Sequence, residues 1–180
     1  LTLVCLTLFF ALRSFKLLFI TFISLITGLI LTAGFATISV GHLNLISIAF
    51  AVLYIGLGVD FAIHLCLRYR ELIAKQKSNL EAIHGSIQSV GKSLILCAIT
   101  TSIGFFAFIP TDYAGVSELG IISGAGMFIG LIVSLTLLPA LLSILPIHSI
   151  TQGKAITPRL DHLATLPFRF STTIRIAVIF

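Results

Sequence analysis

Residues 17–40 carry no charged side chain, and the stretch reads LLFITFISLITGLILTAGFATISV. A helix needs about 20 apolar residues to cross the roughly 30 Å of hydrocarbon in a bilayer, and this stretch is longer than that. The whole chain has the same character, because 58% of its residues are hydrophobic and only 9% are charged, against about 25% charged residues in a soluble domain. The sequence therefore predicts a membrane protein.

Further apolar runs predict an all-α fold, a polytopic transmembrane helix bundle over residues 1–147. The predicted spans are a truncated one at about 1–12, complete ones at 17–40, 45–67, 93–110 and 116–145, and the beginning of another at 173–180. The run at 116–145 is long enough to need tilt or a break near Pro139. Residues 148–172 contain Pro, Gly and mixed charge, which is typical of a linker. The chain starts without Met and is expected to be a fragment of something larger.

All 11 Lys and Arg residues fall in alternate connections between the predicted spans. They are Arg13 and Lys16 in the first, Arg68, Arg70, Lys75, Lys77 and Lys92 in the second, and Lys154, Arg159, Arg169 and Arg175 in the third. The opposite connections hold His42, Asp112 and Glu118 but no Lys or Arg. Basic loops stay in the cytoplasm, so these three connections, including the linker, are predicted to be cytoplasmic. The net charge of +5 follows from this topology, and no nucleic-acid partner is expected.

The second cytoplasmic connection has a helical pattern of its own. Apolar residues recur at helical spacing between polar ones, and they are Leu72, Ile73, Leu80, Ile83, Ile87, Val90 and Leu94. This pattern predicts an amphipathic helix at about 71–91 that lies on the cytoplasmic surface of the membrane.

Asp60 is the one charged residue in the apolar run from Tyr54 to Leu67. It precedes Arg68 by eight residues, or roughly 12 Å along a helix, which places it inside the hydrocarbon on the cytoplasmic side of centre. An ionised Asp at the bilayer centre costs about 2.5 to 3.5 kcal/mol, and desolvation favours its neutral form, so we expect reversible protonation near neutral pH. Such a group handles protons or ions by default. The alternative is a structural Asp that hydrogen-bonds a neighbouring helix.

His64 follows Asp60 by four residues, which places both on one helical face with His64 one turn nearer the cytoplasm. It is a candidate to pass protons to or from Asp60, and the alternative is an interfacial histidine near the helix end. Gly56 and Gly58 precede Asp60 and leave a surface without side chains, where another helix or a file of water can approach. The predicted site is therefore a proton relay of Asp60 and His64, with both glycines in the helix packing around it.

The sequence contains no catalytic or metal-binding constellation. The three cysteines, Cys5, Cys66 and Cys97, all lie in apolar runs, so they indicate neither a disulfide framework nor zinc-ligand spacing. The loops hold no Ser/His/Asp or Cys/His arrangement, and the histidines are spread over both predicted sides of the membrane. The chain is not expected to be an enzyme or to hold a metal ion or a cofactor.

Two stretches resemble known transporters. GLGVDFAIHLCLRYRE, residues 56–71, resembles the fourth-span motif of the MMPL-like branch of the resistance-nodulation-division (RND) superfamily. SIGFFAFIPTDYAGVSELGIISGAGM, residues 102–127, resembles the fifth and sixth spans of that branch. Both stretches are most similar to the hopanoid-biosynthesis-associated RND transporters of bacteria, and the same five spans correspond to the sterol-sensing domain of eukaryotic relatives. The resemblance covers nearly the whole chain.

The resemblance implies a fragment of an exporter, driven by the proton-motive force, that moves hopanoid-like lipids from the bacterial inner membrane towards the outer envelope. Asp60 matches the Asp of the family's proton relay. Many members follow that Asp with Tyr, whereas Phe61 stands here, packs around the relay and removes a hydroxyl from it. The implied partners are membrane lipids, the lipid substrate, protons and the remaining half of the same transporter, with a homo-oligomer left open.

Two other interpretations of the sequence remain. The first is a sterol- or lipid-sensing or scaffold domain, in which Asp60 is structural and no protons flow. The second is an RND protein-translocation subunit, which keeps the spans but not the motif around Asp60.

Overall fold

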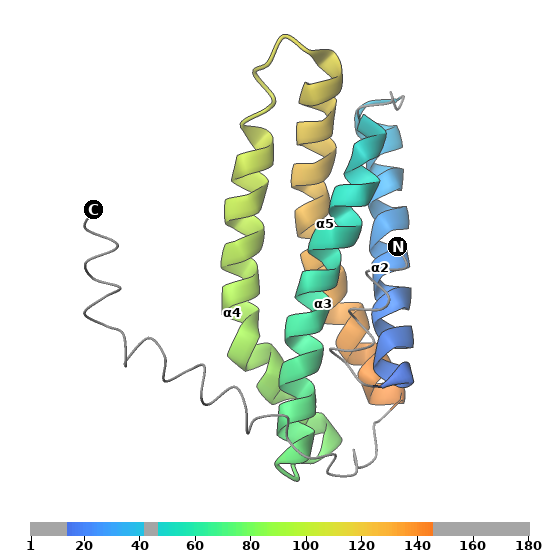
Figure 1. The fold of residues 1–180 in the computed structure, drawn as a ribbon, viewed down its shortest axis with the longest axis vertical. Coiled ribbons are helices and arrows are strands. Elements are labelled where there is room, and N and C mark those ends of the chain that lie inside the picture. Colours follow the sequence, from blue (N-terminus) through green and yellow to red (C-terminus); the bar gives the residue numbers. More distant parts are fainter. Residues whose placement is uncertain (1–13, 42–46, 146–180) are drawn as a thin grey trace, which may run out of the picture. The chain divides into compact units, whose positions relative to one another are not determined.

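The computed structural model of the protein describes residues 14–41 and 47–145. The helices are α2 (Phe15–Ser39), a short 3-10 turn η1 (Ser47–Ala49), α3 (Phe50–Ala74), α4 (Asn79–Phe106) and α5 (Ala114–Ile144). Four of these, α2 to α5, are long and apolar enough to cross a membrane, and they run side by side (Figure 1). The predicted all-α bundle of membrane helices is confirmed. The predicted segments 1–12, 148–172 and 173–180 lie outside the described residues.

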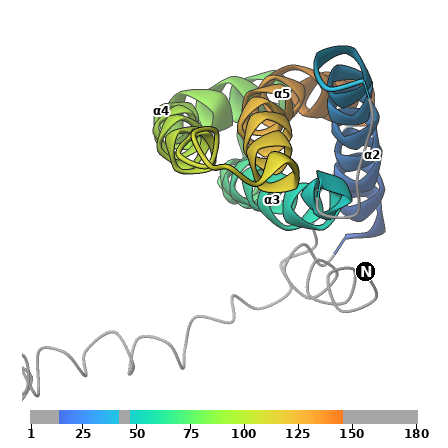
Figure 2. The ribbon, with the colours of Figure 1, turned by 90° about the horizontal axis from the view of Figure 1, so that it is seen from above.

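Helix α5 is the centre of the bundle. It packs against α2, α3 and α4, whereas α2 and α4 lie on opposite sides of it and do not touch within the described residues (Figure 2). One end of the bundle carries the turn with Asp112, between α4 and α5, and we call it the Asp112 end. The opposite end carries the turn at residues 75–78 between α3 and α4, and we call it the basic end (Figure 1).

Glycines let α5 approach its neighbours closely. Those buried on α5 are Gly120, Gly124, Gly126 and Gly130. A Cβ atom on Gly120 would lie 2.6 Å from the backbone oxygen of Phe105, and one on Gly124 would lie 2.3 Å from the ring of Phe106. A side chain at Gly120 would therefore push α4 and α5 apart, and one at Gly124 would displace the Phe106 ring, as expected where membrane helices pack through small residues.

Tyr54 of α3 fills a second gap, between α2 and α5. Its side chain is buried, and a Cβ atom on Gly28 of α2 would lie 1.7 Å from its hydroxyl oxygen. A Cβ atom on Gly130 of α5 would lie 3.2 Å from the same oxygen. Two glycines on two helices thus make room for one tyrosine, which joins three helices at one level.

The segment between α3 and α4 differs from the sequence-based prediction. The predicted amphipathic helix at 71–91 and the predicted span at 93–110 are not separate helices, because α4 runs unbroken from Asn79 to Phe106. Its first turn is fixed by a capping box in which Ser78 and Glu81 bond each other's backbone N–H groups. No proline interrupts it, so the helix continues through the region where a break was expected.

The apolar side of this first part of α4 packs inside the bundle. Ala82, Ile83 and Leu94 are buried, and the Leu72 side chain of α3 lies 3.0 Å from where a Cβ atom on Gly85 would be. Part of the amphipathic pattern therefore reflects contact with other helices, whereas Leu80 is 73% exposed. Helix α5 likewise continues through Pro139, which is buried near its end.

A polar contact ties three helices together at the basic end. The Tyr69 hydroxyl of α3 donates to Asn79 Oδ1 at the start of α4, at 2.6 Å. The Asn79 side-chain amide in turn donates to the Leu142 carbonyl of α5, at 3.3 Å. Tyr69 is fully buried and Asn79 is half-buried, so the bond is partly shielded from solvent. We call this chain of bonds the Tyr69–Asn79 clamp.

Candidate functional site

The predicted relay residues lie on one exposed stripe of α3. The stripe, which we call the Asp60 face, consists of Leu53, Gly56, Asp60, His64, Leu67 and Glu71, all of them exposed. Their spacing of three and four residues keeps them on one side of the helix. The structure therefore brings Asp60 and His64 together on one face, and that face points away from the other helices.

Neither relay residue is bound by the described bundle. Among residues 14–41 and 47–145, no hydrogen bond or ion pair involves the side chain of Asp60 or of His64. Gly56 has open space around it, since no atom lies within 4 Å of where its Cβ atom would be. On this stretch of the Asp60 face the side chains thus have no polar partner among the described residues, and no other described side chain lies against Gly56.

The two other predicted packing residues point elsewhere. A Cβ atom on Gly58 would lie 3.3 Å from Leu25 of α2, so Gly58 belongs to the contact between α2 and α3. Phe61 is 3% exposed and packs with Leu94, Ala98, Met127 and Leu131. A hydroxyl added at position 61 would enter this apolar cluster. The structure therefore separates Phe61 from the face that carries Asp60.

The exposure of Asp60 has a physical consequence in a membrane. A carboxylate facing hydrocarbon near the bilayer centre costs about 2.5 to 3.5 kcal/mol, and such groups face protein or a water-filled space instead. The Asp60 face therefore needs a cover of polar protein groups or water. Since the four described helices do not supply it, the cover has to come from outside them.

The chemistry available on this face is proton binding. Asp60 and His64 are both groups whose charge changes on gain or loss of one proton. In the part of the chain that the structure describes, no group of three or more His, Cys, Asp or Glu residues is placed to hold a metal ion. Asp60 and His64 thus lie one helical turn apart on one face, without a hydrogen bond between their side chains.

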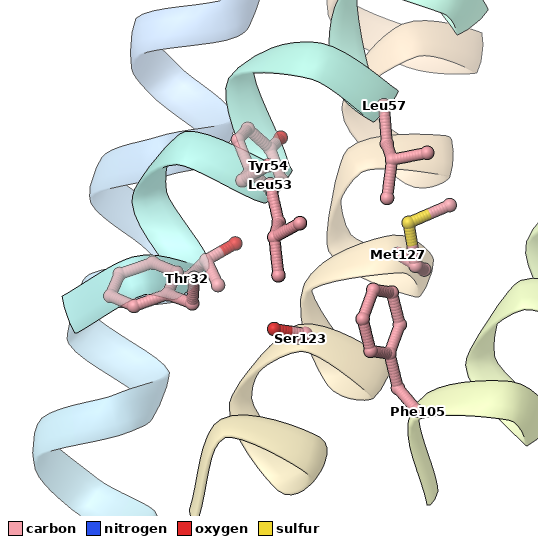
Figure 3. Close-up of a pocket in the computed structure, with 8 residues that line it drawn as sticks. Thr32, Leu53, Tyr54, Leu57, Phe105, Ser123 and Met127 are labelled. Atoms are coloured by element: carbon pink, nitrogen blue, oxygen red, sulfur yellow. The ribbon is translucent and has the colours of Figure 1, made fainter. Parts of the chain in front are cut away.

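A second polar feature, inside the bundle, was not predicted from the sequence. A cavity of about 10 Å³ lies among α2, α3, α4 and α5, and its lining includes the hydroxyl-bearing side chains Thr32, Tyr54 and Ser123. In Figure 3 the hydroxyl oxygens of Thr32 and Ser123 point into the space between the helices. Single Ser and Thr residues in apolar runs are a weak sequence signal, because they are common in packed membrane helices.

The chain resembles known transporters along most of its length. It matches the MMPL family over residues 1–166. The hopanoid transporter HpnN of Burkholderia multivorans is 43% identical over 157 residues, which are 87% of this chain and 17% of that protein. The hopanoid transporter HpnN of Rhodopseudomonas palustris is 45% identical over 142 residues, 79% of this chain and 16% of that protein.

A more distant relative is an exporter of a different cargo. The apo-petrobactin exporter of Bacillus anthracis is 31% identical over 93 residues, 52% of this chain and 12% of that protein. The chain thus spans about a sixth of the length of the two hopanoid transporters and a smaller share of this exporter.

Proposed function

The chain belongs to the MMPL family, and from that premise we propose that it is part of a proton-driven exporter of hydrophobic, hopanoid-like lipids in which Asp60 carries the protons. The lipid class follows from the relatives, since the two hopanoid transporters are 43% and 45% identical to it. The proton-carrying role rests on a different observation, the position of Asp60.

The observation that carries the proposal is that Asp60 and His64 share the one face of α3 that the bundle leaves uncovered. An Asp that served only to join helices would be bonded to another helix of its own bundle. Asp60 has no such bond within the described residues. A carboxyl group on an uncovered face can instead exchange protons with water or with a polar group of a moving partner.

The partner that covers the Asp60 face is, in this proposal, another part of the same protein. The chain covers 16–17% of the hopanoid transporters that it matches, which leaves ample length for a second set of helices. Gain of a proton by Asp60 would weaken its attraction to cationic or hydrogen-bond-donating groups on that second set. Export would then follow from repeated making and breaking of this contact.

The proposed orientation places the basic end on the cytoplasmic side of a bacterial inner membrane, because the turn with Asp112 contains no Lys or Arg. An impermeant thiol reagent applied to intact cells whose outer membrane is permeabilised should label Thr111→Cys and leave Gln76→Cys unlabelled. Labelling of Gln76→Cys alone would reverse the orientation.

The proton-carrying role is tested in the full-length protein by Asp60→Asn, which removes the titrating group at nearly constant volume. Transfer of hopanoids from the inner to the outer membrane, followed by mass spectrometry of the separated membranes, should be abolished while expression and folding remain normal. Asp112→Asn is the matched control, since Asp112 is an exposed carboxylate in a turn, and it should transport normally. Normal transport by a well-folded Asp60→Asn protein would leave Asp60 structural.

A further inference from the structure

The cavity inside the bundle has the size of one water molecule. The space open to the centre of a water-sized sphere is about 10 Å³. A cavity needs roughly 10 to 15 Å³ of such space to hold one water molecule. It lies toward the Asp112 end, between Thr32 of α2, the first turns of α3, and Ser123 and Met127 of α5 (Figure 3). Most of its wall is apolar, so a polar molecule inside would be held by few groups.

One of those groups lacks a partner. Ser123 is 7% exposed, and its hydroxyl forms no hydrogen bond with any described residue. A buried hydroxyl without a partner is costly, and native proteins usually satisfy such a group with protein or water. By contrast, Ser102, which is also buried, donates to the Gly124 carbonyl at 2.9 Å. The buried Ser24 hydroxyl also lacks a partner among the described residues, but only Ser123 of the two lines the cavity, so Ser123 is the unpartnered group that a ligand there could satisfy.

Thr32 supplies the second group. Thr32 is fully buried, and its hydroxyl donates to the Gly28 carbonyl of its own helix at 2.8 Å. The donor is therefore used, but the lone pairs of the oxygen remain available to accept a hydrogen bond. A water molecule in the cavity could donate to Thr32 and bond Ser123, which gives it the two polar partners that a buried water requires.

The cavity lies close to the Asp60 face. Leu53 and Leu57 of α3 are part of its wall. Leu53 belongs to the Asp60 face and lies two turns before Asp60, and Leu57 precedes Asp60 by three residues, or about 4.5 Å along the helix. Two leucine side chains thus stand between the interior of the cavity and the surface on which Asp60 lies.

We infer that this cavity binds a water molecule between Ser123 and Thr32, and that this water lies on the path by which protons reach Asp60 from the Asp112 end. The inference rests on the proposed proton-carrying role of Asp60. The bound water accepts a proton from a hydronium ion at the Asp112 end, which becomes neutral water, and it releases another of its protons, through a second water that passes Leu53 and Leu57, to the Asp60 carboxylate. The carboxylate becomes a neutral carboxylic acid, and the bound water is left unchanged.

Met127 offers a direct readout of the water. It is the single methionine of the chain, it lines the cavity, and it is 3% exposed. An X-ray pulse splits water into hydroxyl radicals, which oxidise side chains next to a bound water even when bulk solvent cannot reach them. In full-length protein in lipid nanodiscs, mass spectrometry should find Met127 oxidised in wild type and oxidised several-fold less in Ser123→Ala.

Ser102→Ala is the matched control, because it removes a buried, satisfied hydroxyl that does not line the cavity. It should leave Met127 oxidation at the wild-type level. Equal oxidation of Met127 in wild type and Ser123→Ala, or no oxidation in wild type, would overturn the water site. Ser123→Ala should itself fold, since it removes a hydroxyl that bonds no described residue.

Transport measurements separate this inference from the proposed function. Ser123→Ala should export hopanoids several-fold more slowly than wild type, and Ser102→Ala should not. Lower Met127 oxidation with wild-type transport in Ser123→Ala would overturn the path through this water while Asp60 keeps its role. Wild-type transport by Asp60→Asn would instead overturn the proposed function, whatever the oxidation of Met127.

Discussion

The two faces of α3 differ in what surrounds them. The inward face carries Tyr54, Phe61 and Tyr69, which are 7%, 3% and 0% exposed and pack against three other helices. The outward face carries Asp60 and His64, which are exposed and whose side chains bond no described residue. The same helix therefore packs inside the bundle on one side, and on the other side it presents polar side chains that the described helices leave uncovered.

The comparison separates stability from proton chemistry. Contacts on the inward face hold the bundle together and contain no carboxylate. The carboxylate sits where its protonation changes no contact of the described bundle, so a change in its charge can act on a partner without unfolding the helices around it. We therefore expect substitutions on the inward face to alter stability and substitutions on the Asp60 face to alter transport.

The largest effect is expected for Phe61→Ala, which opens a hole in the cluster of Leu94, Ala98, Met127 and Leu131. Phe→Ala changes in protein cores cost about 3 to 5 kcal/mol. The thermal midpoint of the full-length protein in detergent should fall clearly, while transport per folded molecule is retained. The comparison would break if Phe61→Ala kept its thermal midpoint but lost transport, since the inward face would then belong to the relay.

A smaller effect is expected for the Tyr69–Asn79 clamp. Tyr69→Phe removes the part-buried hydrogen bond from the tyrosine hydroxyl to Asn79, worth about 1 kcal/mol, and leaves the ring in place. Asn79→Ala removes the same bond and also the bond to Leu142. In a double-mutant cycle of unfolding free energies the two changes should couple by roughly 0.5 to 1.5 kcal/mol. Fully additive effects would mean that the bond between Tyr69 and Asn79 contributes nothing to the free energy of unfolding.

The smallest effect is expected for His64→Gln on the Asp60 face. If His64 passes protons to Asp60, its removal should slow transport a few-fold and change its dependence on pH between 5 and 8, where histidine changes charge. Asp60, four residues earlier, is the titratable neighbour on the same face. Stability should be unchanged. An unaltered rate and pH profile would show that protons reach Asp60 without His64.

Part of this arrangement could be predicted from the sequence. Charge-free runs are long enough to reveal membrane helices, and spacing by four residues places Asp60 and His64 on one face whatever the neighbours are. The sequence also predicts that Phe61 points in a different direction from Asp60, because adjacent residues of a helix point about 100° apart. A ring at position 61 therefore cannot point where Asp60 points.

Other features depend on tertiary packing. The first part of α4 alternates apolar and polar residues, and this pattern is the same whether the apolar side faces lipid headgroups or Leu72 of α3. Likewise, a Ser in an apolar run does not reveal its partner. Ser102 finds a carbonyl on α5 and Ser123 finds none among the described residues, and this difference arises only when the helices are assembled.

The most direct test of the account is whether Asp60 itself gains and loses a proton. Infrared difference spectra of the full-length protein in lipid, recorded while the pH is stepped from alkaline to acidic, detect the carbonyl stretch of a protonated carboxyl group. The account predicts a band that appears within the working pH range of the transporter, that shifts in heavy water, and that is missing in Asp60→Asn but present in Asp112→Asn. The same band in wild type and Asp60→Asn would contradict it.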